Sequence, residues 1–325
     1  ELAHTAASEE ELRRACALPG CEWTYLRFVR AEEGGPWRPA AGTFGGWPER
    51  AAEITVLDPC CGSGHFLVEA FRILVSMRMA EEGLSAREAC DAVLRQDLFG
   101  LEIDERCTQI AAFNLALAAW SWPGADGYRP LPELHIACSG LAVGAKEEEW
   151  LRLAGKDERL REGMRRLYQL FKEAPTLGSL IDPWREFEAR PDELEFDKGR
   201  FDELRPLLER ALAREEVRRD AQATAAGIAA QGMAKAAALL AGSYTLVITN
   251  VPYLGRKSHV DVLKAWADRF EKEAKNDLAT MFVSSMLRWA ERAGSIATVT
   301  PQNWLFLVSY KKLRERQLEN RTWNV

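Results

Sequence analysis

The sequence predicts an α/β protein built on a mostly parallel sheet, and three observations favour this fold class. Short apolar strands alternate with helical segments along residues 51–145, and the alternation resumes after residue 242. A glycine-rich loop directly follows the first of these strands, at residues 58–66. A polar turn follows a later strand in the same way, at residues 249–253. Strands that alternate with helices of this length are typical of parallel sheets with crossover helices.

The first half of the pattern is expected to contain three strands and three helices. It begins with the apolar strand Ile54–Leu57, which leads through the glycine loop into an amphipathic helix. Ser85 is expected to cap the second helix, because a serine oxygen accepts from the free N–H groups at a helix start. The expected elements after the first strand are a helix at 65–82, a helix at 86–95, a strand at 98–104, a helix at 105–120 and a strand at 134–138.

Residues 146–241 interrupt this alternation. They are rich in Glu, Arg, Leu and Ala, and they predict several helices broken near Pro175, Pro183 and Pro191. We therefore expect one sheet with a large helical insertion, divided into regions 1–50, 51–145, 146–241 and 242–325. The elements expected after the insertion are a strand at 244–248, helices at 260–274 and 277–292, a strand at 295–300 and a helix at 309–320.

Length and composition limit the class of protein. A chain of 325 residues that is 47% hydrophobic can bury a full core. No apolar run approaches the ~20 residues that a membrane span needs, and no secretory signal is present. The seven cysteines form no secreted framework and the four histidines have no metal-site spacing, so we expect reduced thiols, no metal and a cytoplasmic protein.

The charge distribution bears on the kind of partner. The net charge is −6 and the pI about 5.5, which argues mildly against a simple nucleic-acid-binding domain, since such domains are often basic. Cations nevertheless gather between Arg256 and Arg316. Because the sequence starts with Glu1 and ends without a stop signal for a helix, we interpret the chain as a piece of a longer protein.

The glycine loop is the first candidate site. Gly62 and Gly64 allow a sharp turn and a close approach to a ligand, and the next helix points its N-terminus at that ligand. A Gly-x-Gly pattern alone is weak, since dinucleotide and phosphate sites use similar turns. Glu102 ends the next strand and can accept hydrogen bonds from two ribose hydroxyls. Alternatively, Glu102 and Asp104 cap the following helix, an interpretation that suits Asp104 better.

The polar turn at Asn250 is the second candidate site. The exocyclic amine of a purine or pyrimidine is a poor nucleophile, because its lone pair is delocalised into the ring. Two acceptors, the Asn250 side-chain oxygen and the Val251 carbonyl, could localise that lone pair. Pro252 stiffens the turn and Tyr253 offers a face for stacking. Alternatively, the turn is only a polar end to the strand.

Residues Asp58-Pro-Cys-Cys-Gly-Ser-Gly-His-Phe66 resemble motif I of the amino-methyltransferases, and Asn250-Val-Pro-Tyr253 resembles their Asn-Pro-Pro-Tyr motif IV. The order of the two motifs is similar to that of gamma-arranged N6-adenine DNA methyltransferases. The closer resemblance is to the PglX-type adenine methyltransferases of bacterial BREX phage-defence systems. The supporting stretches are residues 40–44, 46–48, 99–104, 137–141 and 300–304.

This resemblance implies a Rossmann-like methyltransferase fold that uses S-adenosyl-L-methionine. Region 51–145 would be its cofactor-binding half and region 242–325 its catalytic half. The partners implied are double-stranded DNA and other phage-defence proteins, with no membrane. The catalytic residues implied are Asn250, Val251, Pro252 and Tyr253. The cofactor-binding residues implied are Asp58, Pro59, Gly62, Ser63, Gly64, Phe66, Glu102, Ile103 and Ser139.

Three departures from the family pattern matter. Val251 replaces the first proline of motif IV, which keeps the carbonyl but makes the turn less rigid. Cys138 and Ser139 stand where many relatives have an acid near the cofactor adenine. The resemblance implies that the parts that read the DNA sequence lie beyond residue 325. Two alternatives therefore remain: a methyltransferase for RNA adenine or protein glutamine amide, and a module that binds DNA or cofactor without turnover.

Overall fold

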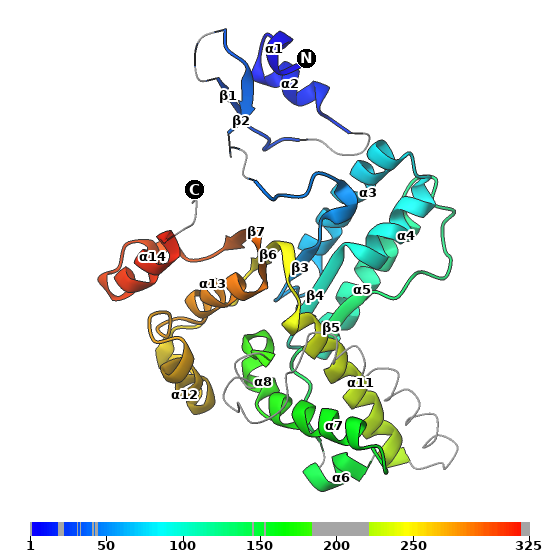
Figure 1. Cartoon of the computed structure of the whole chain (residues 1–325), viewed down its shortest axis with the longest axis vertical. Coiled ribbons are helices and arrows are strands. Elements are labelled where there is room, and N and C mark those ends of the chain that lie inside the picture. The colour runs from blue at the N-terminus through cyan, green and yellow to red at the C-terminus, as the bar shows by residue number, and fades with distance from the viewer. Residues whose placement is uncertain are drawn as a thin grey trace.

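A five-stranded parallel sheet lies at the centre of the computed structural model, with the strand order β5-β4-β3-β6-β7 (Figure 1). The structure describes residues 2–183 and 221–319, apart from residues 19–22, 31, 33, 41, 43, 44, 145 and 153. Several sequence predictions lie outside the described residues: those for Ala41, Thr43 and Phe44, for residues 184–220 with Pro191, and for residues 320–325.

The two halves of the sequence pattern join in the middle of this sheet. β3 (Val56–Asp58) pairs in parallel with β6 (Tyr244–Asn250), and the Thr55 N–H donates to the Thr245 hydroxyl at 2.8 Å. The prediction of one sheet interrupted by an insertion is therefore confirmed. The remaining strands are β4 (Leu98–Glu102), β5 (His135–Cys138) and β7 (Ala290–Val299).

Three helices cover one face of the sheet. Ser85 and Glu88 form a reciprocal cap at the start of the second helix, and the Asp104 carboxylate caps the third. A cluster of buried side chains, among them Leu67, Phe71 and Leu115, joins these helices to the strands. The predicted bounds of the first and third helices are confirmed. The helices are α3 (His65–Glu82), α4 (Ala86–Gln96) and α5 (Glu105–Trp120).

Helices of the insertion and of the C-terminal half cover the other face. α11 (Ala221–Ala241) contacts β5 and β4, and α13 (Leu278–Trp289) contacts β7 and β6. Leu57 and Leu101 from the sheet belong to the same buried cluster as α7 and α11. The sheet is thus the middle of three layers (Figure 1). The smaller helices of this side are α6 (Glu147–Arg152), α7 (Glu158–Phe171), α8 (Ala174–Leu177) and α12 (Asp261–Phe270).

Several C-terminal elements differ from their predicted bounds. β7 starts at Ala290 rather than at residue 295, because Ala290 pairs with Tyr244 before a register shift in the ladder. Gly294 lies at this shift, where an added Cβ would come within 3.0 Å of the Thr245 carbonyl oxygen. The helices predicted at 260–274 and 277–292 are also shorter, since α12 ends at Phe270 and α13 ends at Trp289, directly before β7. The helix predicted at 309–320 is α14 (Lys311–Leu318).

The N-terminal residues form a small separate unit above the sheet in Figure 1. Ser8 caps its longer helix, as predicted, by accepting from the Glu11 N–H at 3.1 Å. A two-stranded antiparallel ribbon follows. Within the described parts of the chain, no helix combines the length and the apolar character of a membrane span. The elements of this unit are α1 (Leu2–Thr5), α2 (Glu9–Ala15), β1 (Phe28–Arg30) and β2 (Trp37–Pro39).

Candidate functional site

The strand order reverses between β3 and β6. From β3 the chain adds β4 and β5 on one side, and it then returns to place β6 and β7 on the other. In open parallel sheets this reversal leaves a crevice at the carboxyl ends of the strands, where ligands bind. Both segments singled out by the sequence, residues 58–66 and 250–253, follow these two central strands.

The two glycines of the first loop have different surroundings. Gly64 has a φ of +83°, and an added Cβ would lie 3.0 Å from the Ala111 Cβ of α5. Gly62 has a φ of +53°, and an added Cβ would meet nothing within 4 Å. The packing of α5 therefore requires Gly64, whereas Gly62 faces the open space that a ligand could fill. Asn114, which the sequence did not single out, ties α5 to the loop by donating to the Ser63 carbonyl at 2.8 Å.

Asp58 is a buried carboxyl at the end of β3, only 1% exposed. Burial raises its pKa to about 7, and the nearby charge of Glu102 adds to the rise, while the Cys60 N–H donates to Oδ1 at 3.1 Å and opposes it. Burial also raises the pKa of the Cys60 and Cys61 thiols, so both stay neutral. Asp58 can therefore gain its charge when a cation binds beside it.

Glu102 holds the loop to the end of β4. Its Oε2 accepts from the Gly62 N–H at 2.8 Å, and its Oε1 accepts from the Ile103 N–H at 2.8 Å. Oε1 also accepts from the Asp104 N–H at 3.1 Å, so three of the about four acceptor positions of the carboxylate are used and one remains for a hydroxyl donor. Asp104 instead caps α5, since its Oδ1 accepts from the Arg106 N–H at 2.8 Å. The capping interpretation is therefore correct for Asp104.

An open recess of about 430 Å³ lies beside Glu102, at the carboxyl ends of β4 and β5. Ile103 is 44% exposed and forms part of its wall. Gly140 forms another part, and an added Cβ there would come within 2.1 Å of the Ile103 carbonyl oxygen, so only glycine fits. The other lining residues are Asp104, Glu105, Cys138, Leu141, Ala142 and Pro175.

The remaining predicted cofactor residues differ in how exposed they are to solvent. Ser139 is fully buried, and its hydroxyl lies 3.0 Å from the Ser179 hydroxyl, so its side chain has a structural partner. Pro59 is buried within the turn and Ser63 is half-buried. Phe66 is 38% exposed on the first turn of α3. The loop thus presents Gly62, Ser63 and Phe66 toward solvent.

The turn after β6 is more exposed than the glycine loop. Val251 is 2% exposed and packs in the core, whereas Asn250 and Pro252 are exposed and Tyr253 is 52% exposed. The Tyr253 hydroxyl donates to the Asn250 Oδ1 at 3.0 Å and lies 3.4 Å from the Val299 carbonyl oxygen. The tyrosine ring is therefore held beside the asparagine amide by its own hydroxyl.

Backbone and imidazole contacts hold the chain just after this turn. The Leu278 N–H donates to the Leu254 carbonyl at 2.9 Å, and the His259 Nε2 lies 2.8 Å from the same oxygen. His259 is 3% exposed, so its ring is part of the support of the turn. The sequence did not indicate this role, because a lone histidine carries no spacing signal.

The pairing of β3 with β6 connects the two segments. Thr249, which immediately precedes Asn250, is buried at 1% exposure. The structure therefore brings the glycine loop and the asparagine turn to the ends of adjacent strands in one sheet. Within the described residues, no cluster of three His, Cys, Asp or Glu side chains could hold a metal ion.

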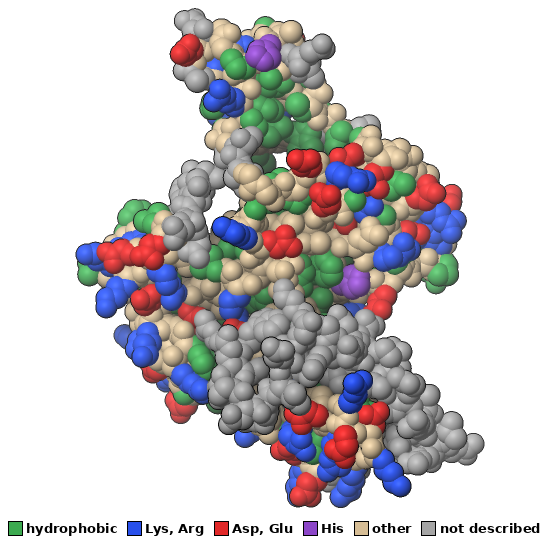
Figure 2. All heavy atoms as spheres, in the orientation of Figure 1, with side chains coloured by type: hydrophobic (Ala, Val, Ile, Leu, Met, Phe, Trp, Pro, Cys, Tyr) green, Lys and Arg blue, Asp and Glu red, His purple; other side chains and the backbone are tan. Residues whose placement is uncertain are grey.

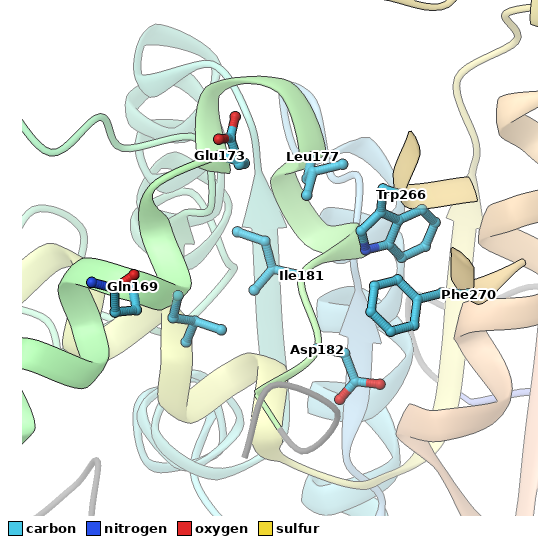
Figure 3. Close-up of a pocket in the computed structure, with 8 residues that line it drawn as sticks. Gln169, Glu173, Leu177, Ile181, Asp182, Trp266 and Phe270 are labelled. Atoms are coloured by element: carbon cyan, nitrogen blue, oxygen red, sulfur yellow. The ribbon is translucent and has the colours of Figure 1, made fainter. Parts of the chain in front are cut away.

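A second, smaller cavity of about 60 Å³ lies between α7, α8 and α12 (Figure 3). Trp266 and Phe270 form its aromatic side and Asp182 its acidic end. None of the predicted site residues lines it, so it is separate from the crevice between β3 and β6.

Comparison with known proteins identifies the family. Residues 96–325 match the Eco57I restriction-modification methylase family. The chain belongs to this family. Residues 44–123 also match the DNA-methyltransferase domain of MmeI. The first match includes β4, the insertion and the asparagine turn, and the second includes the glycine loop.

Three curated relatives extend the comparison of this Eco57I-family chain. Adenine-specific methyltransferase BrxX of Escherichia coli O9:H4 (strain HS) is 31% identical over 294 residues, which cover 83% of this chain and 23% of the relative. Adenine-specific methyltransferase PglX of Lacticaseibacillus casei (strain Zhang) is 26% identical over 275 residues, which cover 82% of this chain and 21% of the relative. Adenine-specific methyltransferase PglX of Streptomyces coelicolor is 35% identical over 96 residues, which cover 29% of this chain and 7% of the relative. The chain thus spans less than a quarter of the length of these relatives.

Proposed function

We propose that this chain is the catalytic core of an S-adenosylmethionine-dependent methyltransferase that modifies N6 of adenine in DNA. The observation that carries the proposal is the pairing of β3 with β6, which puts the glycine loop beside the Asn250 turn. A cofactor bound at the glycine loop and a planar amine bound at the Asn250 turn would lie next to each other.

The cofactor side fits the chemistry of S-adenosylmethionine part by part. The Asp58 carboxyl suits the ammonium of the methionine portion, and the open space at Gly62 admits the ligand to the loop. Glu102 retains an acceptor position for a ribose hydroxyl. The recess beside Ile103 suits the purine ring. When bound, the cofactor would supply the methyl group from its sulfonium sulfur.

The substrate side fits a planar amine rather than an alcohol or a thiol. Asn250 Oδ1 and the Val251 carbonyl are the acceptors for the two N–H bonds of the target, which localises the nitrogen lone pair. Tyr253 offers an exposed ring face for stacking. This is positioning combined with preorganised electrostatics, and it needs no strong base.

Several observations support DNA adenine as the substrate. The relatives are named adenine-specific methyltransferases, and the matching family is one of restriction-modification methylases. Lys and Arg side chains gather around α12 and α14 beside the turn, interspersed with acidic ones (Figure 2). By the same likeness we place the protein in a BREX-type or restriction-modification defence system in the cytoplasm, with other phage-defence proteins as partners.

Methyl transfer from labelled S-adenosylmethionine tests the proposal, with duplex DNA, RNA and a glutamine-bearing peptide as substrates for the intact protein. The expected result is labelling of adenine N6 in DNA alone, abolished in Asn250→Ala. Labelling of RNA or of the peptide would replace DNA as the substrate class. Binding of cofactor and DNA without any transfer would make the chain a binding module.

A further inference from the structure

The helical insertion reaches the recess beside Glu102 through one short turn. We define the α8 turn as residues 174–180, which contain α8 and the 3-10 turn Gly178–Leu180. Pro175 lines the recess together with residues from the ends of β4 and β5. Figure 1 shows α8 below the sheet, between α12 and α11.

The α8 turn contacts the ends of both strands that build the recess. Gly178 has a φ of +50°, and an added Cβ would lie 3.0 Å from the Ile103 Cδ1 and 3.2 Å from its Cγ1. Next to it, the Ser179 hydroxyl lies 3.0 Å from the Ser139 hydroxyl, with both residues buried. The turn therefore fixes Ile103 from one side and the end of β5 from the other.

The α8 turn is also anchored from behind, so it is a rigid wall. Leu180 is 1% exposed and Ile181 3% exposed, and both belong to the main core cluster. Asp182 pairs with Arg288 of α13 at 2.5 Å. A wall held by core packing and an ion pair keeps its position when the recess is empty.

The lining of the recess suits a flat heterocycle. Ile103, Leu141 and Pro175 supply apolar surface, and the Glu105 carboxylate supplies an acceptor for an exocyclic amine, while Asp104 is bound by Arg106. Binding sites for small planar ligands combine mostly apolar walls with few polar groups in this way. Glu102, the proposed ribose acceptor, immediately precedes Ile103.

We propose that the α8 turn is a cofactor-binding element, with Pro175 and the Gly178–Ile103 contact forming the wall against which the purine of the cofactor packs. This inference rests on the proposed function for the identity of the cofactor. It gives the insertion a role at the cofactor site, although the insertion lies outside the two motifs that carry the family resemblance.

A glycine pair inside the insertion provides the test. Gly178→Ala adds a methyl group against Ile103, whereas Gly155→Ala adds one at a φ of +57° with nothing within 4 Å. Both variants place a methyl group at a positive φ, and Gly178, with a ψ of −128°, is the more strained position for alanine; only the first variant displaces Ile103. Calorimetry with S-adenosylhomocysteine and with adenosine should show about tenfold weaker binding of both for Gly178→Ala, the scale of one misplaced apolar contact. Gly155→Ala should stay within about twofold of the unsubstituted protein, as distant surface changes do.

Pro175→Ala gives a second test that spares the fold, because Pro175 is exposed. It should weaken binding of both probes by about threefold to tenfold, through loss of apolar surface from the wall. The neighbouring variant Thr176→Ala should leave binding unchanged. If Gly178→Ala and Pro175→Ala both bind the probes as the unsubstituted protein does, the wall assignment is wrong. If the unsubstituted protein binds neither probe, the proposed function fails instead.

Discussion

The loop after β3 and the turn after β6 are adjacent, yet they are built differently. The loop is enclosed: Asp58 and Gly64 are buried, and Glu102 and Asn114 hold its backbone. The turn is open, since three of the four residues from Asn250 to Tyr253 are exposed and only Val251 is buried.

This difference means that the cofactor loop is already formed in the free protein, whereas the hydrogen bonds of the turn are completed only when substrate binds. In the loop, protein groups already satisfy the backbone N–H of Gly62, so cofactor binding needs little rearrangement. In the turn, the Asn250 oxygen accepts from the Tyr253 hydroxyl, and a target amine would share or take over that acceptor. Changes in the loop should therefore alter cofactor binding in the absence of substrate, whereas changes in the turn should alter only the steps that involve substrate.

The largest effect on the loop side is expected from Gly62→Asp. The new side chain would fill the open space in front of the loop, and its charge would lie near Asp58 and Glu102. Calorimetry should show no measurable binding of S-adenosylmethionine. The loss of stability should stay near the ~1–2 kcal/mol of a left-handed backbone position.

Gly64→Ala provides the contrasting variant for this prediction. Its added methyl group would press on Ala111 of α5, at 3.0 Å from that Cβ. It should lower the thermal midpoint more than Gly62→Asp does. Unaltered cofactor affinity in Gly62→Asp would show that the loop does not face the ligand.

On the turn side, Tyr253→Ala should weaken binding of a flipped base by about 1–3 kcal/mol, the scale of base–aromatic stacking. Tyr253→Phe should retain most of that binding, because it keeps the ring and loses only the hydroxyl contacts with Asn250 and the Val299 carbonyl. Fluorescence titration with a duplex carrying a base analogue at the target would measure both. A mismatch at the target should partly rescue Tyr253→Ala, since extruding the base then costs less. Equal losses in the Ala and Phe variants would argue against stacking.

Cofactor affinity should depend on pH through Asp58. Its pKa in the free protein is raised to about 7, chiefly by burial, and a ligand ammonium needs the ionised carboxylate. Affinity should therefore rise by at most about tenfold per pH unit as the pH approaches about 7, and it should fall again at basic pH where the ligand ammonium loses its own proton. The free energy of unfolding should change in the opposite direction. The contribution of Asp58 to that stability falls as the pH rises from its ordinary pKa of 3.8 to its raised pKa of about 7.

Calorimetric titration of the cofactor between acidic and mildly basic pH measures this dependence. Asp58→Asn removes the titrating group with little change of shape, so its affinity should be weak and nearly independent of pH. A profile for Asp58→Asn that matches the unsubstituted protein would assign the dependence to another group.

The smallest effect is expected from Val251→Pro. Val251 is 2% exposed, and its carbonyl, which is the proposed acceptor, is kept by the substitution. The proline should stiffen the turn, so the methylation rate should be preserved or raised. A steady-state rate on DNA measures this, and a large drop would show that the buried valine is needed for packing.

The strands and helices around both segments were predictable because local signals mark them. The bounds of α3 and α5 follow from Gly64 and from the Asp104 cap, and the apolar run at Tyr244 marks β6. The start of β7 was not predictable, because its pairing of Ala290 with Tyr244 depends on a strand distant in sequence.

The candidate site was predictable in its motifs and not in its surroundings. Position 64 requires glycine because Ala111 of α5 leaves no room for a side chain. The hydroxyl of Ser139 is hydrogen-bonded to Ser179 of the insertion. Both contacts join segments that no local pattern connects. The same holds for Asn114 and His259, which support the two segments from neighbouring helices and loops.

The most direct test of the central claim is a single-turnover methylation assay with Asn250→Ala in the intact protein, together with calorimetry of cofactor binding on the same preparation. The Asn250 oxygen is the proposed acceptor for the target amine, so the methyl-transfer rate should fall by about 10²–10³, as when one preorganised polar partner of a transition state is removed. Cofactor affinity should stay unchanged, because Glu102 and the loop remain intact. Transfer to adenine at the unsubstituted rate would contradict the claim and leave the turn as no more than the end of β6.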